Sequence, residues 1–218
     1  MVIQVIPPGG TVAGKDRNHF IKKYWQALCP VPRGSNPAWE NTGGKDGPFN
    51  ANVGAELYML SFSRNPQSQV TRNIHVPNNK GLFIPIMSVI VSECEKPNET
   101  TDKLIAIANK DQAGIASNSL SLELDGTPLP INTLNNYKSN PATIGTFSVN
   151  FPPPPQAIFP IDSPGPCNAV AGGRYVWTDA LSPGEHTVSF KGNLQCAPPT
   201  DCIDSNYMED IIYKITVP

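Results

Sequence analysis

The feature that most constrains this chain is an alternation of apolar and polar side chains along several short stretches. Residues 120–124 alternate leucine with serine and glutamate, and residues 70–76, 186–190 and 211–217 show the same period of two. Successive side chains of a strand point to opposite faces of a sheet, so these stretches predict half-buried strands. The nearly continuous apolar run 82–91 predicts a strand that is covered on both faces.

Proline is abundant, with 24 of the 218 residues, which is roughly twice its usual share. Proline lacks a backbone donor and is excluded from helix interiors and central strands, so this composition favours a loop-rich β architecture. Residues 57–62, 143–149 and 174–177 are further expected strands. We therefore predict a mainly β fold, a two-sheet antiparallel β-sandwich of the immunoglobulin-like or jelly-roll-like kind.

Two stretches have helical rather than strand periodicity. The apolar residues at positions 20, 21, 24, 25 and 28 fall on one helical face, with Asp16 as a suitable N-cap and Pro30 as a terminator. A second helix is expected to begin near Thr101 and to end at Gly114. Both are short, and we place them at the periphery of the sandwich.

The chain is predicted to form one domain over residues 1–218, because β-sandwiches often reach this length without a division. Residues 151–173 are irregular, and the four consecutive prolines at 152–155 favour an extended polyproline II segment. We interpret 151–173 as a Pro/Cys-rich loop insertion pinned by Cys167.

Charge and hydropathy exclude several classes of protein. Sixteen basic and 18 acidic residues give a net charge of −2, and no cluster of basic residues offers a surface for phosphate backbones, so nucleic-acid binding is not expected. The longest apolar run, 81–91, is shorter than the roughly 18 residues needed for a membrane span. The first residues lack the charged region and long apolar core of a signal peptide, which leaves a cytosolic protein or one whose signal has been removed.

The five cysteines favour the second alternative. Cys196 and Cys202 can pair with each other, or either of them with Cys167, and Cys29 can pair with Cys94 across the fold. Such disulfides persist in oxidising compartments, whereas buried free thiols are the other interpretation. An N-glycosylation sequon at Asn98 points the same way, so we expect an extracellular or cell-surface protein.

Several segments together resemble a family of uncharacterised secreted or surface β-sandwich proteins of microbes. The most specific is the block at 76–86, which reads Val-Pro-Asn-Asn-Lys-Gly-Leu-Phe-Ile-Pro-Ile. The aromatic helix at 24–28, Asn36-Pro37, Gly47-Pro48, Glu93-Cys94, the turn at 183–187 and the final strand complete the set. The resemblance implies this fold and secretion, but no activity.

Candidate catalytic residues are few. Glu93 follows the apolar strand and has Glu95, Glu56 or Asp46 as a partner carboxylate, as a glycosidase-type hydrolase requires. His75 lies on the polar face of its strand and is the other weak candidate, while His19 and His186 read as structural. The chain contains neither the G-x-S-x-G sequence of a serine hydrolase nor an H-E-x-x-H metalloprotease sequence.

A metal site has only weak support in the sequence. Asp201, Asp204, Glu209 and Asp210 form an acidic cluster that reads as a solvated loop, with Ca²⁺ as the alternative. Paired carboxylates near Glu93 admit Ca²⁺ as well. We predict no other cofactor.

Four aromatic residues in or near loops are candidates for a ligand-binding surface that stacks on sugars: Trp39, Tyr137, Tyr175 and Trp177. Three functions therefore stay open. The first is a non-catalytic binding or structural module that contacts carbohydrate or another surface protein. The second is a hydrolase centred on Glu93. The third is a self-assembling homo-oligomer, in which residues 1–6 are extended and remote from their own core.

Overall fold

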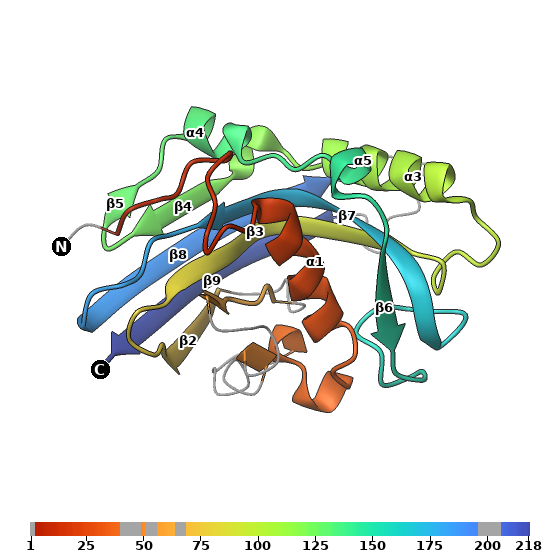
Figure 1. The fold of residues 1–218 in the computed structure, drawn as a ribbon, viewed down its shortest axis with the longest axis horizontal. Helices are drawn as coiled ribbons and strands as arrows, with labels where there is room; N and C mark the ends of the chain where they lie inside the picture. Colours follow the sequence, from red (N-terminus) through yellow and green to blue (C-terminus); the bar gives the residue numbers. More distant parts are fainter. Residues whose placement is uncertain (1–2, 40–48, 51–55, 64–68, 196–205) are drawn as a thin grey trace.

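The structure, a computed structural model, describes residues 3–39, 49–50, 56–63, 69–195 and 206–218. Two packed sheets form the body of the molecule (Figure 1). The four-stranded sheet has the order β1-β3-β7-β6, and the five-stranded sheet has the order β2-β9-β8-β4-β5. The strands are β1 (Leu57–Met59), β2 (Val70–His75), β3 (Gly81–Ser92), β4 (Ser121–Leu124), β5 (Thr127–Pro128), β6 (Phe147–Phe151), β7 (Gly165–Trp177), β8 (Gly184–Gln195) and β9 (Asn206–Val217).

The five-stranded sheet confirms the strands that the alternation predicts. β8 and β9 pair antiparallel over their full length, and Phe190 opposite Ile211 marks the apolar face. β4 alternates exposed and buried residues, and β2 does the same. Asp125 and Gly126 connect β4 to β5 with φ values of 49° and 77°, as a tight hairpin turn requires.

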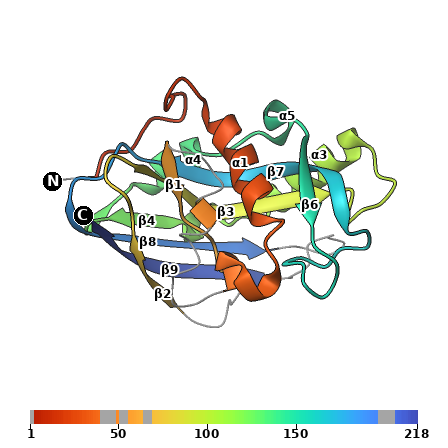
Figure 2. The same ribbon diagram turned by 60° about the horizontal axis from the view of Figure 1, so that its bottom comes forward.

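The central strands of the four-stranded sheet, β3 and β7 from residue 169 onward, are buried on both faces. β3 is almost continuously buried, as its apolar composition predicts. The Phe83 ring contacts Phe20 and Tyr24 on one side, whereas Val91 packs with Leu104 of the helix that follows β3. This sheet therefore lies between helical cover and the second layer (Figure 2).

Both predicted helices are confirmed. The first, α1 (Arg17–Leu28), begins at Asp16, whose carboxylate accepts a hydrogen bond from the His19 N–H at 2.9 Å. The second, α3 (Thr101–Ala113), begins at Thr100, whose hydroxyl caps the helix. Two further short helices, α4 (Ile131–Asn136) and α5 (Pro141–Ile144), and the 3₁₀ turns η1 (Arg33–Ser35), η2 (Pro37–Trp39) and η3 (Ser117–Ser119) complete the described elements.

The predicted two-sheet sandwich is confirmed, with differences in detail. The pairs β1–β3 and β2–β9 are parallel, so each sheet is mixed rather than purely antiparallel. The strand expected at 143–149 begins later, at Phe147, because Pro141 starts α5. The insertion expected over 151–173 ends earlier, because β7 begins at Gly165.

Glycines in β7 serve close packing rather than turns. Gly173 has φ of 141°, and a Cβ atom there would lie 2.4 Å from the Met87 carbonyl oxygen of β3. A Cβ atom at Gly172 would lie 3.4 Å from the Gln112 side-chain Cδ of α3. Because Gly172 has no side chain, α3 can pack closely against β7.

The N-terminal segment lies on its own chain. Val5 forms an antiparallel bridge with Thr178, and the Ile6 N–H donates to the Trp177 carbonyl at 3.0 Å. Ile3 is buried as well. The expectation of a remote, extended segment at 1–6 is therefore wrong for residues 3–6, because their apolar side chains are already covered within the chain.

Candidate functional site

The disulfide Cys94–Cys167 fixes one end of the four-stranded sheet. It joins the end of β3 to the start of β7, with the two Cα atoms 5.8 Å apart. The Glu93 N–H donates to the Asn168 carbonyl at 2.9 Å and continues the β3–β7 ladder up to the disulfide. A disulfide is thus present, as expected, but its pairing differs from every alternative that the sequence left open: Cys94 does not pair with Cys29, and Cys167 does not pair with Cys196 or Cys202. Cys29 is a buried free thiol whose pKa is raised well above its usual value by burial.

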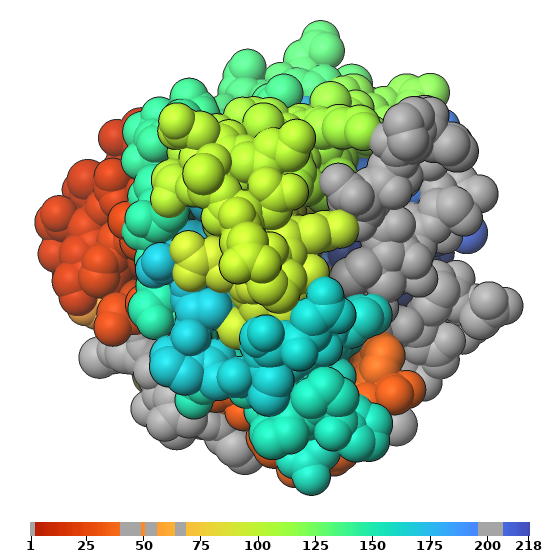
Figure 3. All heavy atoms as spheres, turned by 90° about the vertical axis from the view of Figure 1, so that its right-hand side faces the viewer, coloured from red at the N-terminus to blue at the C-terminus, as the bar shows by residue number. Residues whose placement is uncertain are grey.

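A polar hollow of about 350 Å³ lies beside this disulfide, at the end of the molecule shown in Figure 3. In that view the loop after β3 is yellow-green and the start of β7 is cyan. Asn98 is exposed there with φ of 72°, and its glycosylation stays a prediction. The hollow is lined by Glu93, Cys94, Pro97, Asn98, Glu99, Ser163, Pro164, Pro166 and Cys167.

Two of the candidate acids, Glu93 and Glu95, lie near this end but have different hydrogen-bond partners. Glu93 lines the hollow, and its two carboxylate oxygens accept hydrogen bonds from the Asn168 N–H and Nδ2 at 3.0 and 3.1 Å. Glu95 turns away and accepts from the Ser92 N–H and hydroxyl at 3.0 and 2.8 Å. Burial raises the pKa of Glu95 to about 7, although the hydrogen bonds from Ser92 oppose that shift.

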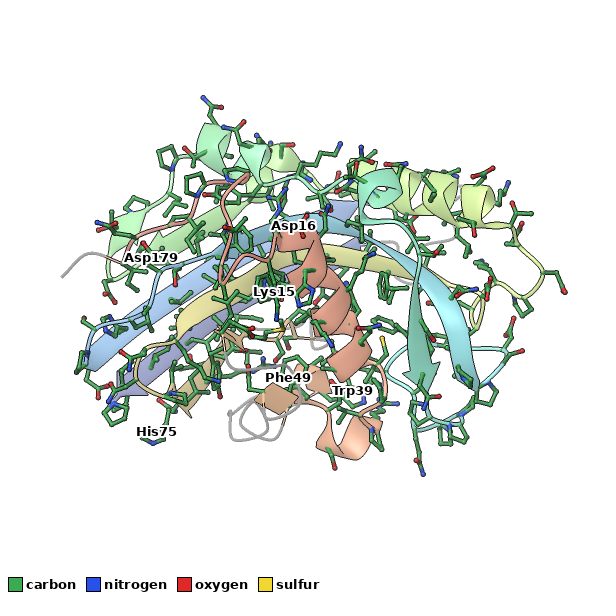
Figure 4. All side chains as sticks on the ribbon, viewed as in Figure 1. Lys15, Asp16, Trp39, Phe49, His75 and Asp179 are labelled. Atoms are coloured by element: carbon green, nitrogen blue, oxygen red, sulfur yellow. A yellow bond between two sulfur atoms is a disulfide. The ribbon has the colours of Figure 1, made fainter. Side chains whose placement is uncertain are left out.

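The remaining candidates for a catalytic site do not lie beside Glu93 in the described part of the chain. His75 is exposed on the outer face of β2, opposite Thr216, and projects from the other end of the molecule (Figure 4). Glu56 forms an ion pair with Lys15 at 2.7 Å. Asp46 lies outside the described residues. Among the candidates that fall within the described residues, the structure therefore brings only Glu93 and Glu95 to the same end.

Three of the four candidate stacking residues are core residues. Tyr175 is fully buried, where its hydroxyl accepts from Trp25 Nε1 and donates to the Gly172 carbonyl. Tyr137 and Trp177 are also buried, and all three are wrong as a sugar-stacking surface because no ring face is open. Trp39 is half-buried, with the Arg33 guanidinium 4.0 Å above its ring.

The acidic cluster near the C-terminus is divided. Asp201 and Asp204 lie outside the described residues, as do Cys196 and Cys202. Asp210 pairs with Lys191 at 2.7 Å across the β8–β9 ladder. Within the described residues, no three His, Cys, Asp or Glu side chains form a group that could hold a metal ion.

The sequence predicted Glu209 in a solvated loop. The structure shows that this is wrong, because Glu209 is buried in β9. Its Oε1 accepts from the Ser63 N–H at 3.3 Å, and Tyr207 donates to the Ser63 carbonyl from the same face. Burial raises the pKa of Glu209 well above its usual value, and the nearby Arg72 offsets this only in part.

Arg72 is the centre of a buried polar cluster that sequence reasoning did not identify. It is fully buried on the inner face of β2. Its Nη1 donates to the Ser61 carbonyl and hydroxyl at 3.0 and 2.6 Å and to the Tyr213 hydroxyl at 2.6 Å. Its Nη2 donates to the carbonyls of Pro37 and Phe62 at 2.8 and 3.3 Å. The guanidinium thus ties two irregular segments to the five-stranded sheet. Its signal in the sequence is an arginine at an apolar position of an alternating stretch.

Ser182, His186 and Asp125 lie in the order of a serine-hydrolase triad. Ser182 Oγ is 3.4 Å from His186 Nε2, and His186 Nδ1 is 2.7 Å from Asp125 Oδ2. However, Nε2 also lies 2.8 Å from the Ser182 carbonyl oxygen, which can only accept a hydrogen bond. Both ring nitrogens are therefore donors, and the imidazolium cannot take a proton from the serine.

The charge on His186 is set by its partners. Burial lowers the pKa of His186, but the hydrogen bonds to Asp125 and Ser182 outweigh burial and leave the pKa raised. The side chain borders a hollow of about 220 Å³ lined by Ile3, Gln4, Asp179, Ala180, Leu181, Ser182 and His186. This set is a structural clamp between the β4–β5 turn and the start of β8.

The fold and these sites define a mixed two-sheet β-sandwich with a disulfide at one end. No known family model and no curated protein matches the chain. Two solved structures are similar to it: the solution structure of amebosin and the crystal structure of the cysteine protease inhibitor EhICP2 from Entamoeba histolytica. In each case the identity is 10%, the match covers 76% of this chain and 100% of that chain, and the TM-score is 0.23, which supports no argument about fold or function. No described helix is long and apolar enough to cross a membrane.

Proposed function

We propose that this protein is a secreted or cell-surface binding module that contacts another protein through the hollow beside Cys94–Cys167, without catalysis. The observation that carries the proposal is the disulfide beneath the hollow. It joins two segments that are 73 residues apart in the sequence and holds the walls of the hollow in one arrangement. Binding to walls that are already fixed avoids most of the cost of ordering loops.

The chemistry of the hollow favours recognition over reaction. Both oxygens of Glu93 accept hydrogen bonds from Asn168, which hold this carboxylate in one orientation. Glu93 and Glu99 give the walls negative charge, and Pro97, Pro164 and Pro166 add rigid apolar surface. This combination suits a partner segment with a lysine or arginine side chain, whose apolar stem packs on proline while its charge meets the carboxylates.

Carbohydrate is the less favoured ligand. The rings at positions 137, 175 and 177 are buried, and Arg33 covers a face of Trp39. Self-assembly through the N-terminal segment is disfavoured as well, because residues 3–6 are docked on the end of β7.

Site-specific photo-cross-linking tests the proposal. A benzoylphenylalanine at position 98, on the rim of the hollow, is expected to capture a defined protein in intact cells or culture medium of the native source. The same residue at position 123, exposed on β4, is the matched control. Capture should be lost when Cys94 and Cys167 are both replaced with alanine. Equal capture from both positions, or free thiols at 94 and 167 in the native protein, would refute the proposal.

A further inference from the structure

Arg174 of β7 is a buried arginine whose donors are not satisfied. Only 4% of the residue is exposed. Its Nε and Nη1 are buried, and neither has a hydrogen-bond partner among the described residues. No ion pair of that part of the chain includes Arg174, and burial is the only cause that lowers the pKa of its guanidinium. A buried guanidinium without a counter-charge is costly, so it calls for a ligand.

The adjacent helix supplies a second unsatisfied donor. Gln112 of α3 is 1% exposed, and its Oε1 accepts from the Gly173 N–H at 2.7 Å. This bond fixes the orientation of the amide, because the opposite orientation would set two donors against each other. The Gln112 Nε2 is therefore a donor, and it is buried without a hydrogen-bond partner in the described structure.

The register of the sheet brings these donors to the same face. Met87, Ser88 and Val89 of β3 lie opposite Arg174, Gly173 and Gly172 in turn, so Arg174 and Gly172 share one face. The Gln112 amide covers that face, with its Cδ 3.4 Å from the Cβ position at Gly172. Gly172 has no side chain to separate Gln112 from Arg174.

We propose that Arg174 and Gln112 form a site for a small oxyanion, meaning a phosphate, sulfate or carboxylate group. Guanidinium and amide N–H groups are the donors that such groups accept, and a negative charge would compensate the buried cation. The third guanidinium nitrogen, Nη2, is not one of the buried atoms that lack a hydrogen-bond partner. The ligand would therefore enter on the side of Nη2. This site lies on β7 and α3, apart from the hollow at Cys94–Cys167, and does not depend on the function proposed there.

Anion titrations test the site in the whole protein. Sodium phosphate, sulfate and acetate are titrated separately against sodium chloride at constant ionic strength and pH, while the Nε–H resonance of Arg174 is followed by NMR and Tm by thermal unfolding. At least one oxyanion is expected to give a saturable shift of that resonance and a rise in Tm. The three salts distinguish a phosphate, sulfate or carboxylate ligand.

Variants separate this site from general salt effects. These variants lack the Arg174 Nε–H, so the rise in Tm is compared: Arg174→Met should require at least tenfold more oxyanion for the same rise, and Arg174→Lys should require less of an increase because the charge is kept. Arg33→Met, which removes an arginine stacked on Trp39, is the matched control and should respond like the wild type. The proposal is overturned if no oxyanion gives a saturable response, as expected if ordered water satisfies these donors, or if Arg174→Met responds as the wild type does.

Discussion

The two buried arginines of the described residues lead to one sharp prediction about stability. Arg72 and Arg174 are 0% and 4% exposed, and both lie on strands. Arg72 donates hydrogen bonds to four residues, whereas two nitrogens of Arg174 have no partner among the described residues. We expect Arg72→Met to destabilise the protein strongly and Arg174→Met to leave it unchanged or to stabilise it.

The magnitude for Arg72 follows from the groups that would lose their donor. The carbonyls of Pro37 and Phe62 accept no other hydrogen bond from the described residues, and each costs about 1–3 kcal/mol when buried and unsatisfied. The Ser61 carbonyl keeps the Tyr213 hydroxyl at 2.9 Å and loses less. Release of the buried charge offsets part of the total, so we expect a loss of about 3 kcal/mol, near the range for breaking a buried charged pair.

Urea denaturation at neutral pH and low oxyanion concentration measures both variants. With an m-value of roughly 3 kcal/mol/M, the midpoint for Arg72→Met should fall by about 1 M relative to the wild type. The midpoint for Arg174→Met should not fall, because methionine fills similar volume and has no charge to bury. If both variants lost the same stability, the distinction between a bonded and an unbonded guanidinium would be refuted.

Three further predictions concern the disulfide and two titrating groups. Alanine at both Cys94 and Cys167 should lower the free energy of unfolding by about 4 kcal/mol, measured by urea denaturation; an unchanged midpoint would contradict this. The pKa of His186 is raised on folding, so its contribution to stability is complete below its unfolded pKa of 6.5 and is lost as pH rises through the folded value. His186→Gln should abolish this loss, as measured by unfolding at several pH values. Asp125→Asn should lower the pKa of His186, as measured by NMR, and an unshifted pKa would exclude the clamp. Burial raises the pKa of Glu95 from 4.5 to about 7, so the free energy of unfolding should fall by on the order of 3 kcal/mol as the pH rises from 4.5 to 7. Glu95→Gln should remove this fall in pH-dependent urea denaturation. A slope that persists in the variant would disprove the assignment.

Sequence periodicity predicted the strands well because burial in this fold alternates. β4 and β2 follow the pattern along their whole length. The same period of two occurs in parallel and antiparallel strands, so it could not show that β2 pairs parallel with β9. The sequence analysis did not predict the short helices α4 and α5, because four to six residues are too few to display a helical period.

The disulfide was predictable in kind but not in pairing. Cys94 and Cys167 meet because Cys94 follows β3 and Cys167 lies near the start of β7. These two strands pair antiparallel, and that pairing depends on long-range register. Cys29 follows α1, whose apolar face is buried, and its thiol is enclosed with it. Tyr175 and Trp177 were expected near loops, in a short strand over 174–177, whereas β7 runs from Gly165 through both of them and buries them in the core.

The polar interior shows why the candidate sites are hardest to predict. Arg72 occupies an apolar position between Val70 and Ile74, so the sequence alone indicates that a guanidinium points inward there. Alternation gives no such indication at Arg174, because β7 is buried on both faces from residue 169 onward. Nor can it show which arginine finds acceptors, because the acceptors of Arg72 come from segments far away in the sequence, at residues 37 and 61–62 and at Tyr213. The difference between a structural cation and one that awaits a ligand therefore lies in the register and in the loops, and only the hydrogen bonds of the folded chain reveal it.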